Sequence, residues 1–157
     1  MAALLAAPLA SLYEGPSNVV QFRDFTQFSA AGSTSAFAVE FFAGWCGHCR
    51  SFAPTWKEVA KRTCALTSGG RPLLVIGAVD CVADFLLCNE VGIESFPTIK
   101  MFGEGFPPSG LPLQRCAHGC KSVVETTVAL LEAAPRRVLE AAVSAAGGSS
   151  SGAAVVE

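Results

Sequence analysis

The chain has 157 residues, of which 51% are hydrophobic and only 15% are charged, and its formal net charge is −2. This length suits one domain with a sizeable core and is too short for two domains of ordinary size. The small negative charge and the lack of a basic run argue against nucleic acid or an anionic membrane surface as a partner. No apolar stretch approaches the roughly 18 residues that a membrane-spanning helix needs.

The beginning of the chain and its cysteine content both bear on its compartment. Residues 1–11 are rich in Ala and Leu and end on small residues, as a signal peptide does, but they lack basic residues. We interpret them as a degenerate or truncated remnant of a signal peptide. Seven cysteines are many for a cytosolic chain of this length, because cytosolic thiols are kept reduced. The cysteines therefore predict an oxidising compartment, and their odd number leaves at least one of them unpaired.

Apolar strand patterns alternate with helical patterns along most of the chain. In order, we expect a strand over 19–22, a short helix capped by Asp24, a buried strand over 38–42, a helix from Cys46 that Pro54 kinks, a buried strand over 73–79, a short helix over 85–91, a strand over 99–102, an edge strand over 113–116, and a helix capped by Ser122 and closed by Pro135. Such alternation predicts a mixed sheet with helices on both faces.

The last predicted helix and the residues after it have distinct sequence patterns. In the helix that follows Ser122, Val124, Val128 and Leu131 share one face. Residues 135–157 are rich in Ala, Gly and Ser, and we predict a flexible tail or linker there.

The most informative stretch is an apolar, nearly uncharged strand that runs into Trp-Cys-Gly-His-Cys at residues 45–49. A thiol where a helix begins lies among unpaired backbone N–H groups and at the positive end of the helix dipole, which favour its thiolate. We therefore predict that Cys46 is the attacking nucleophile. Cys49 follows one helical turn later and can resolve or close a disulfide with it. Gly47 leaves room for a substrate chain, and His48 stabilises the reduced form.

These residues resemble the active site of the thioredoxin superfamily, and of its protein disulfide isomerase branch in particular. Glu-Phe-Phe-Ala at 40–43 and Phe-Ala-Pro-Thr-Trp-Lys at 52–57 make the stretch similar to the first thioredoxin domain of the quiescin sulfhydryl oxidases. The resemblance covers residues 12–134 and implies the α/β thioredoxin fold, with a central mixed β-sheet flanked by helices on both faces. It also implies a thiol–disulfide oxidoreductase that forms or isomerises disulfides in reduced or misfolded secretory proteins, in the lumen of the endoplasmic reticulum or Golgi or after secretion.

The resemblance also implies roles for residues outside the cysteine motif. Glu40, six residues before Cys46, matches a buried carboxylate that accepts the proton of the second cysteine, and burial should raise its pKa. Pro97 matches a cis proline that faces the two cysteines. The backbone of Phe96 then pairs with the substrate chain, and Trp45 forms part of the rim of the same groove.

The remaining cysteines are less clearly assigned. Cys81 and Cys88 flank the short helix, and a similarly placed pair forms a structural disulfide in disulfide isomerase relatives. Cys116 and Cys120 match no motif of the family. They pair with each other, or one of them pairs with Cys64, and the sequence leaves both possibilities open.

The resemblance further implies a cofactor that lies outside these residues. In quiescin sulfhydryl oxidases the electrons pass to a separate FAD-binding domain and then to oxygen, which gives hydrogen peroxide. No segment of these 157 residues has the pattern of a helical bundle that holds FAD, so we expect no cofactor in this chain. A flavin-bearing sulfhydryl oxidase domain is the expected partner.

Two other classes of function compete with catalysis. One is a non-catalytic, chaperone-like binding module of the thioredoxin fold, but such a module has no use for an intact pair of reactive cysteines. The other is a small zinc protein, whose remaining ligands would have to come from Cys116, Cys120, His48 or His118. Zinc half-sites usually lie closer together than that, so we predict no metal.

Overall fold

A computed structural model describes residues 11–28, 35–113 and 122–147 of the chain. In chain order its elements are β1 (Val20–Gln21), the 3-10 helix η1 (Phe25–Gln27), β2 (Ala36–Phe42), α1 (Gly47–Thr63), β3 (Thr67–Ser68), β4 (Arg71–Pro72), β5 (Leu74–Asp80), α2 (Phe85–Glu90), β6 (Thr98–Phe102), β7 (Leu111–Pro112), α3 (Val123–Ala133) and α4 (Arg136–Gly147).

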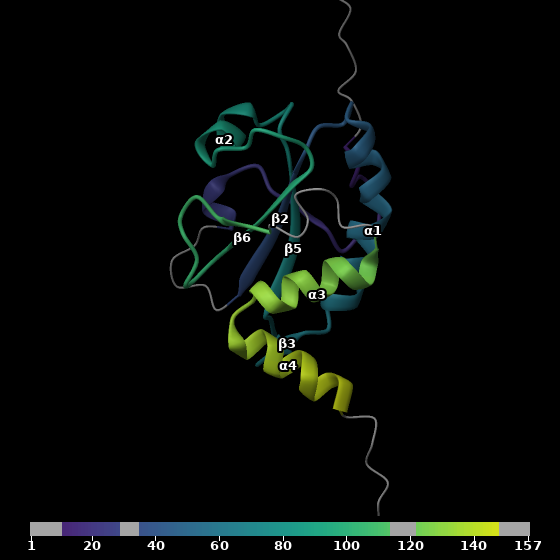
Figure 1. The fold of residues 1–157 in the computed structure, drawn as a ribbon, viewed down its shortest axis with the longest axis vertical. Coiled ribbons are helices and arrows are strands. Elements are labelled where there is room, and N and C mark those ends of the chain that lie inside the picture. Colours follow the sequence, from purple (N-terminus) through teal and green to yellow (C-terminus); the bar gives the residue numbers. More distant parts are fainter. Residues whose placement is uncertain (1–10, 29–34, 114–121, 148–157) are drawn as a thin grey trace, which may run out of the picture.

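Five of the strands form one mixed sheet in the order β1-β5-β2-β6-β7 (Figure 1). β1, β5 and β2 are parallel, whereas β6 runs antiparallel to β2, and β7 antiparallel to β6. β2 lies at the centre, and all 7 of its residues are buried. This explains why its sequence is an almost continuous apolar run, as expected for a strand covered on both faces.

The alternation of side chains along β2 divides the core into two clusters. Even-numbered residues such as Ala38 and Phe42 belong to the larger cluster, together with side chains of α1, α3 and α4. Odd-numbered residues such as Val39 and Phe41 belong to the second cluster, together with side chains of α2. The predicted mixed sheet with helices on both faces is therefore confirmed. Glu40 has even parity, so the pleat of the strand turns it toward α1.

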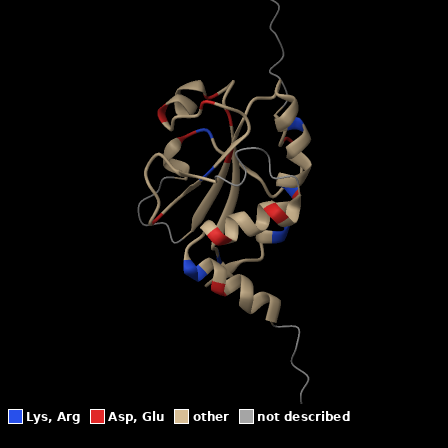
Figure 2. Ribbon diagram, viewed as in Figure 1, with Lys and Arg blue, Asp and Glu red and all other residues tan. Residues whose placement is uncertain are grey.

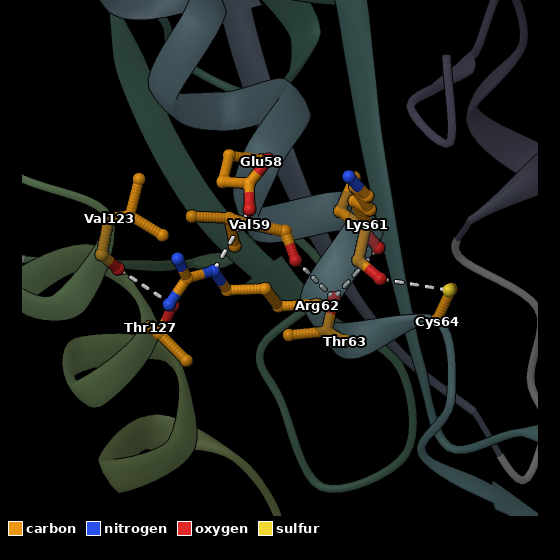
Figure 3. Close-up of polar contacts among 9 residues, drawn as sticks. Glu58, Val59, Lys61, Arg62, Thr63, Cys64, Val123 and Thr127 are labelled. Carbon is orange, nitrogen blue, oxygen red and sulfur yellow. Dashed lines mark hydrogen bonds and ion pairs between the residues drawn. The ribbon is translucent and has the colours of Figure 1, made fainter.

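α1 runs without interruption through Pro54 and is docked on the sheet by its buried side. The indole N–H of Trp56 donates to the carbonyl oxygen of Gly77 in β5 at 3.0 Å. Near the end of the helix, the hydroxyl of Thr63 donates to the carbonyl oxygen of Val59 at 2.8 Å, as Figure 3 shows. The Trp56 bond and the buried side chains of α1 hold the helix against the sheet.

Charged residues are few on the described surface. Figure 2 shows that α1 and α4 carry both basic and acidic residues, whereas the charged residues of α3 are all acidic and acidic residues prevail around α2. Among the described residues, no helix is both long and apolar enough to cross a membrane.

The edge strand that the structure describes next to β6 is β7, whose Leu111 pairs with Met101 of β6. The edge strand expected over 113–116 falls almost entirely outside the described residues. Leu113 still donates its backbone N–H to Ile99 at 3.0 Å, and residues 114–116 lie outside the described part of the chain. A short antiparallel hairpin of β3 and β4 also connects α1 to β5. The positions of such short strands depend on the strands with which they pair, and the local sequence does not specify those partners.

The buried face of α3 also differs from the predicted one. Ser122 caps the helix as expected, with its hydroxyl accepting from the N–H of Glu125 at 3.1 Å. However, Val124 is 64% exposed, and the residues that face the core are Thr126, Ala129 and Leu130. Thr126 tolerates burial because its hydroxyl donates to the carbonyl oxygen of Ser122 at 2.9 Å.

The prediction of a flexible tail over 135–157 was wrong for its first half. Residues 136–147 form α4, and Val138 is fully buried in the larger core cluster. The alanines of α4, which belong to the segment predicted as a flexible tail or linker, have the highest helix propensity of any residue. Pro135 precedes the helix and accepts the N–H of Val138 at 2.8 Å, so it begins a helix as well as following one. Residues 148–157 lie outside the described part.

The packing of α4 predicts different effects for one substitution at two of its positions. Val138→Ala should lower the free energy of unfolding by about 2 kcal/mol, because it removes two buried methyl groups and leaves a cavity. Val143 is 64% exposed on the same helix, and Val143→Ala should change stability by no more than about 0.5 kcal/mol. Urea unfolding followed by circular dichroism measures both. Equal, small effects would mean that α4 does not pack on the core.

Candidate active site

Cys46 lies at the N-terminus of α1, directly after the turn that leaves β2. It is the N-cap residue with an extended backbone (φ −77°), and its own N–H donates to the carbonyl oxygen of Ala43 at 3.0 Å. Partial burial opposes ionisation of its thiol. The backbone N–H groups of Cys49 and His48, the Cys49 thiol and the charge of Arg50 outweigh this effect and lower the pKa of Cys46. The predicted nucleophile is therefore a partly accessible thiol with a favoured thiolate.

Cys49 lies one turn further into α1 and has no exposed surface. Burial is the main cause that raises the pKa of its thiol to about 12, and the hydrogen bond to the sulfur of Cys46 and the negative charge of Glu40 act in the same direction. Two cysteines of one helical turn thus have opposite tendencies to ionise. Both are free thiols in the structure, which is the arrangement of a reduced pair.

Glu40 lies on the face of β2 that is covered by α1, and it is completely buried. Desolvation raises the pKa of its carboxyl group to about 8, although a hydrogen bond from the hydroxyl of Tyr13 lowers it in part. The second carboxylate oxygen, Oε1, is buried without a hydrogen-bond partner in the described part of the chain. A buried carboxyl with a pKa near neutrality beside a buried thiol is suited to accept that thiol's proton.

The loop before β6 brings the predicted substrate-binding residues to the same place. The Phe96–Pro97 peptide bond is cis. The sulfur of Cys46 lies 3.8 Å from the carbonyl oxygen of Phe96. The ring of Trp45 is 64% exposed and stands edge-on to that of Phe96, with ring centroids 6.0 Å apart. The structure therefore brings Trp45, Phe96 and Pro97 to the vicinity of Cys46.

The two remaining residues of the motif are open to solvent. Gly47 and His48 are both exposed in the first turn of α1. A Cβ built on Gly47 would meet nothing within 4 Å, so space for an approaching chain is present there.

The other described cysteines lie away from this pair. Cys81 and Cys88 form a disulfide with a Cα–Cα distance of 5.7 Å, and both belong to the core cluster on the opposite face of the sheet. Cys64 is exposed at the end of α1, where its thiol donates to the carbonyl oxygen of Lys61 at 3.0 Å (Figure 3). Cys116, His118 and Cys120 lie outside the described residues. Within those residues, no three His, Cys, Asp or Glu side chains gather to hold a metal.

Tyr13 is the residue that sequence reasoning missed. It precedes β1 and is 2% exposed, yet it contacts Glu40, which is 27 positions away in the sequence. Tyr13 is the only tyrosine of the chain, and it stands in no recognisable motif. No signal in the sequence connected the two residues.

Comparisons with known proteins agree with this geometry. The family model described as Thioredoxin matches residues 18–127. Sulfhydryl oxidase 1 of Homo sapiens is 40% identical over 121 residues, which cover 69% of this chain and 16% of that protein. Protein disulfide isomerase-like 2-3 of Oryza sativa subsp. japonica is 35% identical over 153 residues, which cover 96% of this chain and 32% of that protein.

Solved structures support the same conclusion. The J-Trx1 fragment of ERdj5 matches with a TM-score of 0.58 and 27% identity over 74% of this chain and 51% of that chain. The chain therefore belongs to the thioredoxin family, and its domain is homologous to those of sulfhydryl oxidase and protein disulfide isomerases. The predicted thioredoxin fold and family are confirmed. The chain spans 16% of the length of the human oxidase and 32% of that of the rice protein.

The helices that the structure describes do not have the arrangement that would hold FAD, the cofactor implied by the resemblance to the oxidases. α1, α3 and α4 bury their apolar side chains in one core with the sheet. In the described part of the chain they do not form the kind of bundle whose interior encloses a flavin ring.

The opposite pKa shifts of the two thiols predict selective alkylation. In reduced protein with Cys64→Ser, iodoacetamide should modify Cys46 first, and the midpoint of its pH–rate profile should lie below about 8.5, the ordinary pKa of a thiol. Cys49 should stay unmodified at neutral pH because it is buried and protonated. Peptide mass mapping assigns the modified cysteine. Earlier modification of Cys49, or an ordinary midpoint for Cys46, would contradict the geometry.

The raised pKa of Glu40 predicts a dependence of stability on pH. The folded protein keeps this proton up to about pH 8, whereas an unfolded Glu releases it near 4.5, so stability falls as pH rises between these values. Glu40→Gln removes this loss. Relative to the wild type, it should gain several kcal/mol between pH 5 and pH 9, at about 1.4 kcal/mol per unit of pKa difference. Urea unfolding at both pH values measures the gain.

A matched variant separates burial from the simple loss of a carboxylate. Glu90 is exposed at the end of α2, and Glu90→Gln should leave the difference between the two pH values unchanged. If Glu40→Gln behaves like Glu90→Gln, the carboxyl group of Glu40 is ionised in the folded protein at neutral pH.

Proposed function

We propose that this chain is a thiol–disulfide oxidoreductase that exchanges disulfides with protein substrates through Cys46 and Cys49. The observation that carries the proposal is the pairing of a partly accessible thiol of lowered pKa with a buried thiol of raised pKa, one helical turn apart. Such a pair gives one sulfur for attack and a second one for release.

In the oxidising direction, the Cys46–Cys49 disulfide accepts two electrons from a substrate dithiol. A substrate thiolate attacks the sulfur of Cys46, which forms a mixed disulfide and releases Cys49 as a thiolate that takes up a proton. The second substrate thiolate then attacks the substrate sulfur of the mixed disulfide. The products are a substrate disulfide and Cys46 thiolate, whose lowered pKa makes it the better leaving group.

In the reducing or isomerising direction, the same steps run backward. The Cys46 thiolate attacks a substrate disulfide and releases one substrate thiolate. Cys49 must then lose its proton to attack the sulfur of Cys46. Glu40 is the proposed acceptor of this proton, because its buried carboxylate faces α1 and its Oε1 oxygen has no partner in the described part of the chain.

The surface around Cys46 supports an extended protein segment as the substrate. The carbonyl oxygen of Phe96 lies beside the sulfur, and it is a backbone acceptor that a substrate N–H can use. Exposed Trp45 offers an apolar platform next to it, and Gly47 adds no side chain in the approach. Pro97 shapes the loop from which Phe96 reaches the sulfur. His48, exposed beside Cys46, is proposed to stabilise the thiolate.

The secretory pathway is the proposed location, with reduced or misfolded secretory proteins as substrates. The Cys81–Cys88 disulfide supports an oxidising compartment, where such bonds persist. The similarity to sulfhydryl oxidase 1 supports a further partner, a flavin-bearing sulfhydryl oxidase domain that reoxidises Cys46 and Cys49.

Trapping of mixed disulfides tests the assignment of the two cysteines. With Cys49→Ser, the second step of the reducing direction is blocked, so disulfide-bonded complexes with a scrambled ribonuclease substrate should accumulate severalfold over the wild type. Non-reducing electrophoresis measures them, and reductant should dissolve them. Cys46→Ser, Cys49→Ser is the matched control and should trap nothing, with Cys64→Ser in all variants. Complexes that survive Cys46→Ser would refute the proposal.

A further inference from the structure

Tyr13 makes the one hydrogen bond recorded for the Glu40 carboxylate in the described structure. Its hydroxyl donates to Oε2 of Glu40, and both side chains are buried. Tyr13 comes from the segment before β1, whereas Glu40 lies in the middle of the central strand. The contact therefore joins two parts of the chain that local sequence does not bring together.

Several contacts hold the tyrosine in place. Its ring stands edge-on to Phe42, with centroids 5.4 Å apart and an interplanar angle of 79°. The side-chain amide of Gln21 donates to the carbonyl oxygen of Tyr13 at 3.1 Å. The ammonium group of Lys57 lies 5.9 Å from the ring centroid. Phe42 of β2 and Lys57 of α1 thus contact the ring, and Gln21 of β1 holds the backbone of Tyr13, so the hydroxyl is directed toward Glu40.

The surroundings of Glu40 contain few other titratable groups. From α1, Cys49 interacts electrostatically with both Glu40 and Tyr13, and Cys46 lies beyond it. Lys57, also on α1, lies over the tyrosine ring. The residues that pair with Glu40 on the neighbouring strands, Ala78 of β5 and Ile99 of β6, cannot titrate. The tyrosine hydroxyl and the thiol of Cys49 are therefore the polar groups that bear most directly on this carboxylate.

We propose that Tyr13 is a positioning residue, whose hydroxyl holds one oxygen of Glu40 and stabilises its ionised form, so that the other oxygen can accept the proton of Cys49. The inference rests on the proposed function, because the proton matters only when Cys49 attacks. In that step Cys49 gives its proton to Oε1 of Glu40, and the resulting thiolate attacks the sulfur of Cys46 and expels the substrate thiolate. The tyrosine proton stays on its own oxygen throughout.

The direction of the effect follows from which form of Glu40 the tyrosine favours. A hydroxyl donates better to a carboxylate than to a carboxylic acid, so losing it favours the protonated form. Protonated Glu40 cannot accept a proton, and the step then needs a higher pH. A stronger donor at the same position should act in the opposite direction and let the step proceed at lower pH.

Because Tyr13 is the only tyrosine of the chain, a tyrosine analogue changes this residue alone. Biosynthetic incorporation of 3-fluorotyrosine alters only residue 13, and the electron-withdrawing fluorine makes its hydroxyl a stronger donor. Tyr13→Phe keeps the ring and removes the hydroxyl. In stopped-flow experiments, the reduced protein reacts with glutathione disulfide, and the rate of the second, unimolecular step is measured against pH.

We expect the midpoint of that profile to rise by about 1 pH unit with Tyr13→Phe, which slows the step about tenfold at neutral pH. With 3-fluorotyrosine the midpoint should fall. The rate of the first, bimolecular attack by Cys46 should change in neither protein. The ¹⁹F resonance of the single fluorotyrosine should shift with pH at the midpoint of Glu40, which gives a readout that does not depend on activity.

Repeating the comparison in Glu40→Gln tests whether Tyr13 acts through the carboxylate of Glu40. In Glu40→Gln, the midpoint and the rate of the second step should be the same with Tyr13 and with Phe at that position. Unchanged midpoints in both modified proteins, or the same effect of Tyr13→Phe in the Glu40→Gln background, would overturn the role of Tyr13. If Tyr13→Phe does not fold, the fluorotyrosine protein alone decides by the direction of its shift. Failure of Cys46 to form any mixed disulfide would instead refute the proposed function.

Discussion

The structure depends on burying β2 on both faces and turning it directly into α1. β2 has one face in each core cluster, and only residues 43–46 connect it to α1. The first turn of α1 must therefore lie over the end of the strand. Cys46 then stands at the free end of the helix, whereas Cys49 is pressed against the sheet beside Glu40. One constraint on the backbone sets the environments of all three groups.

The chemistry follows from the contrast between these environments. Cys46 has access to solvent and to backbone N–H groups that stabilise a thiolate. Cys49, in the same helical turn, has lost its contact with water and keeps its proton. Burial also raises the pKa of Glu40, and the hydroxyl of Tyr13 partly restores its acidity. Desolvation thus dominates this site, and a few oriented hydrogen bonds adjust it.

The opposite face of the sheet carries the disulfide of the described structure. The Cys81–Cys88 disulfide lies there among apolar side chains and next to α2, on the far side of β2 from Cys49. The central sheet therefore separates the buried Cys81–Cys88 disulfide from Cys46 and Cys49. The helices of the last part, α3 and α4, complete the core around α1 and hold it in place without contributing a group to the site.

Sequence by itself determined the parts of this protein that depend on neighbouring residues. Local pattern predicts the apolar strand, the two-cysteine motif at residues 45–49 and the helix that begins there. Helix termini and one-turn spacings involve residues that are close together in the sequence. The mixed sheet followed from the alternation of strand and helix patterns along the chain, and the thioredoxin fold and the oxidoreductase class were implied by the resemblance to a known family. Tertiary structure alone decided the partner of Glu40, the buried face of α3 and the packing of α4. Those features depend on which side chains from distant parts of the sequence come into contact. The alternation of residues in a strand and the periodicity of a helix show which residues share a face, but not which other element that face contacts.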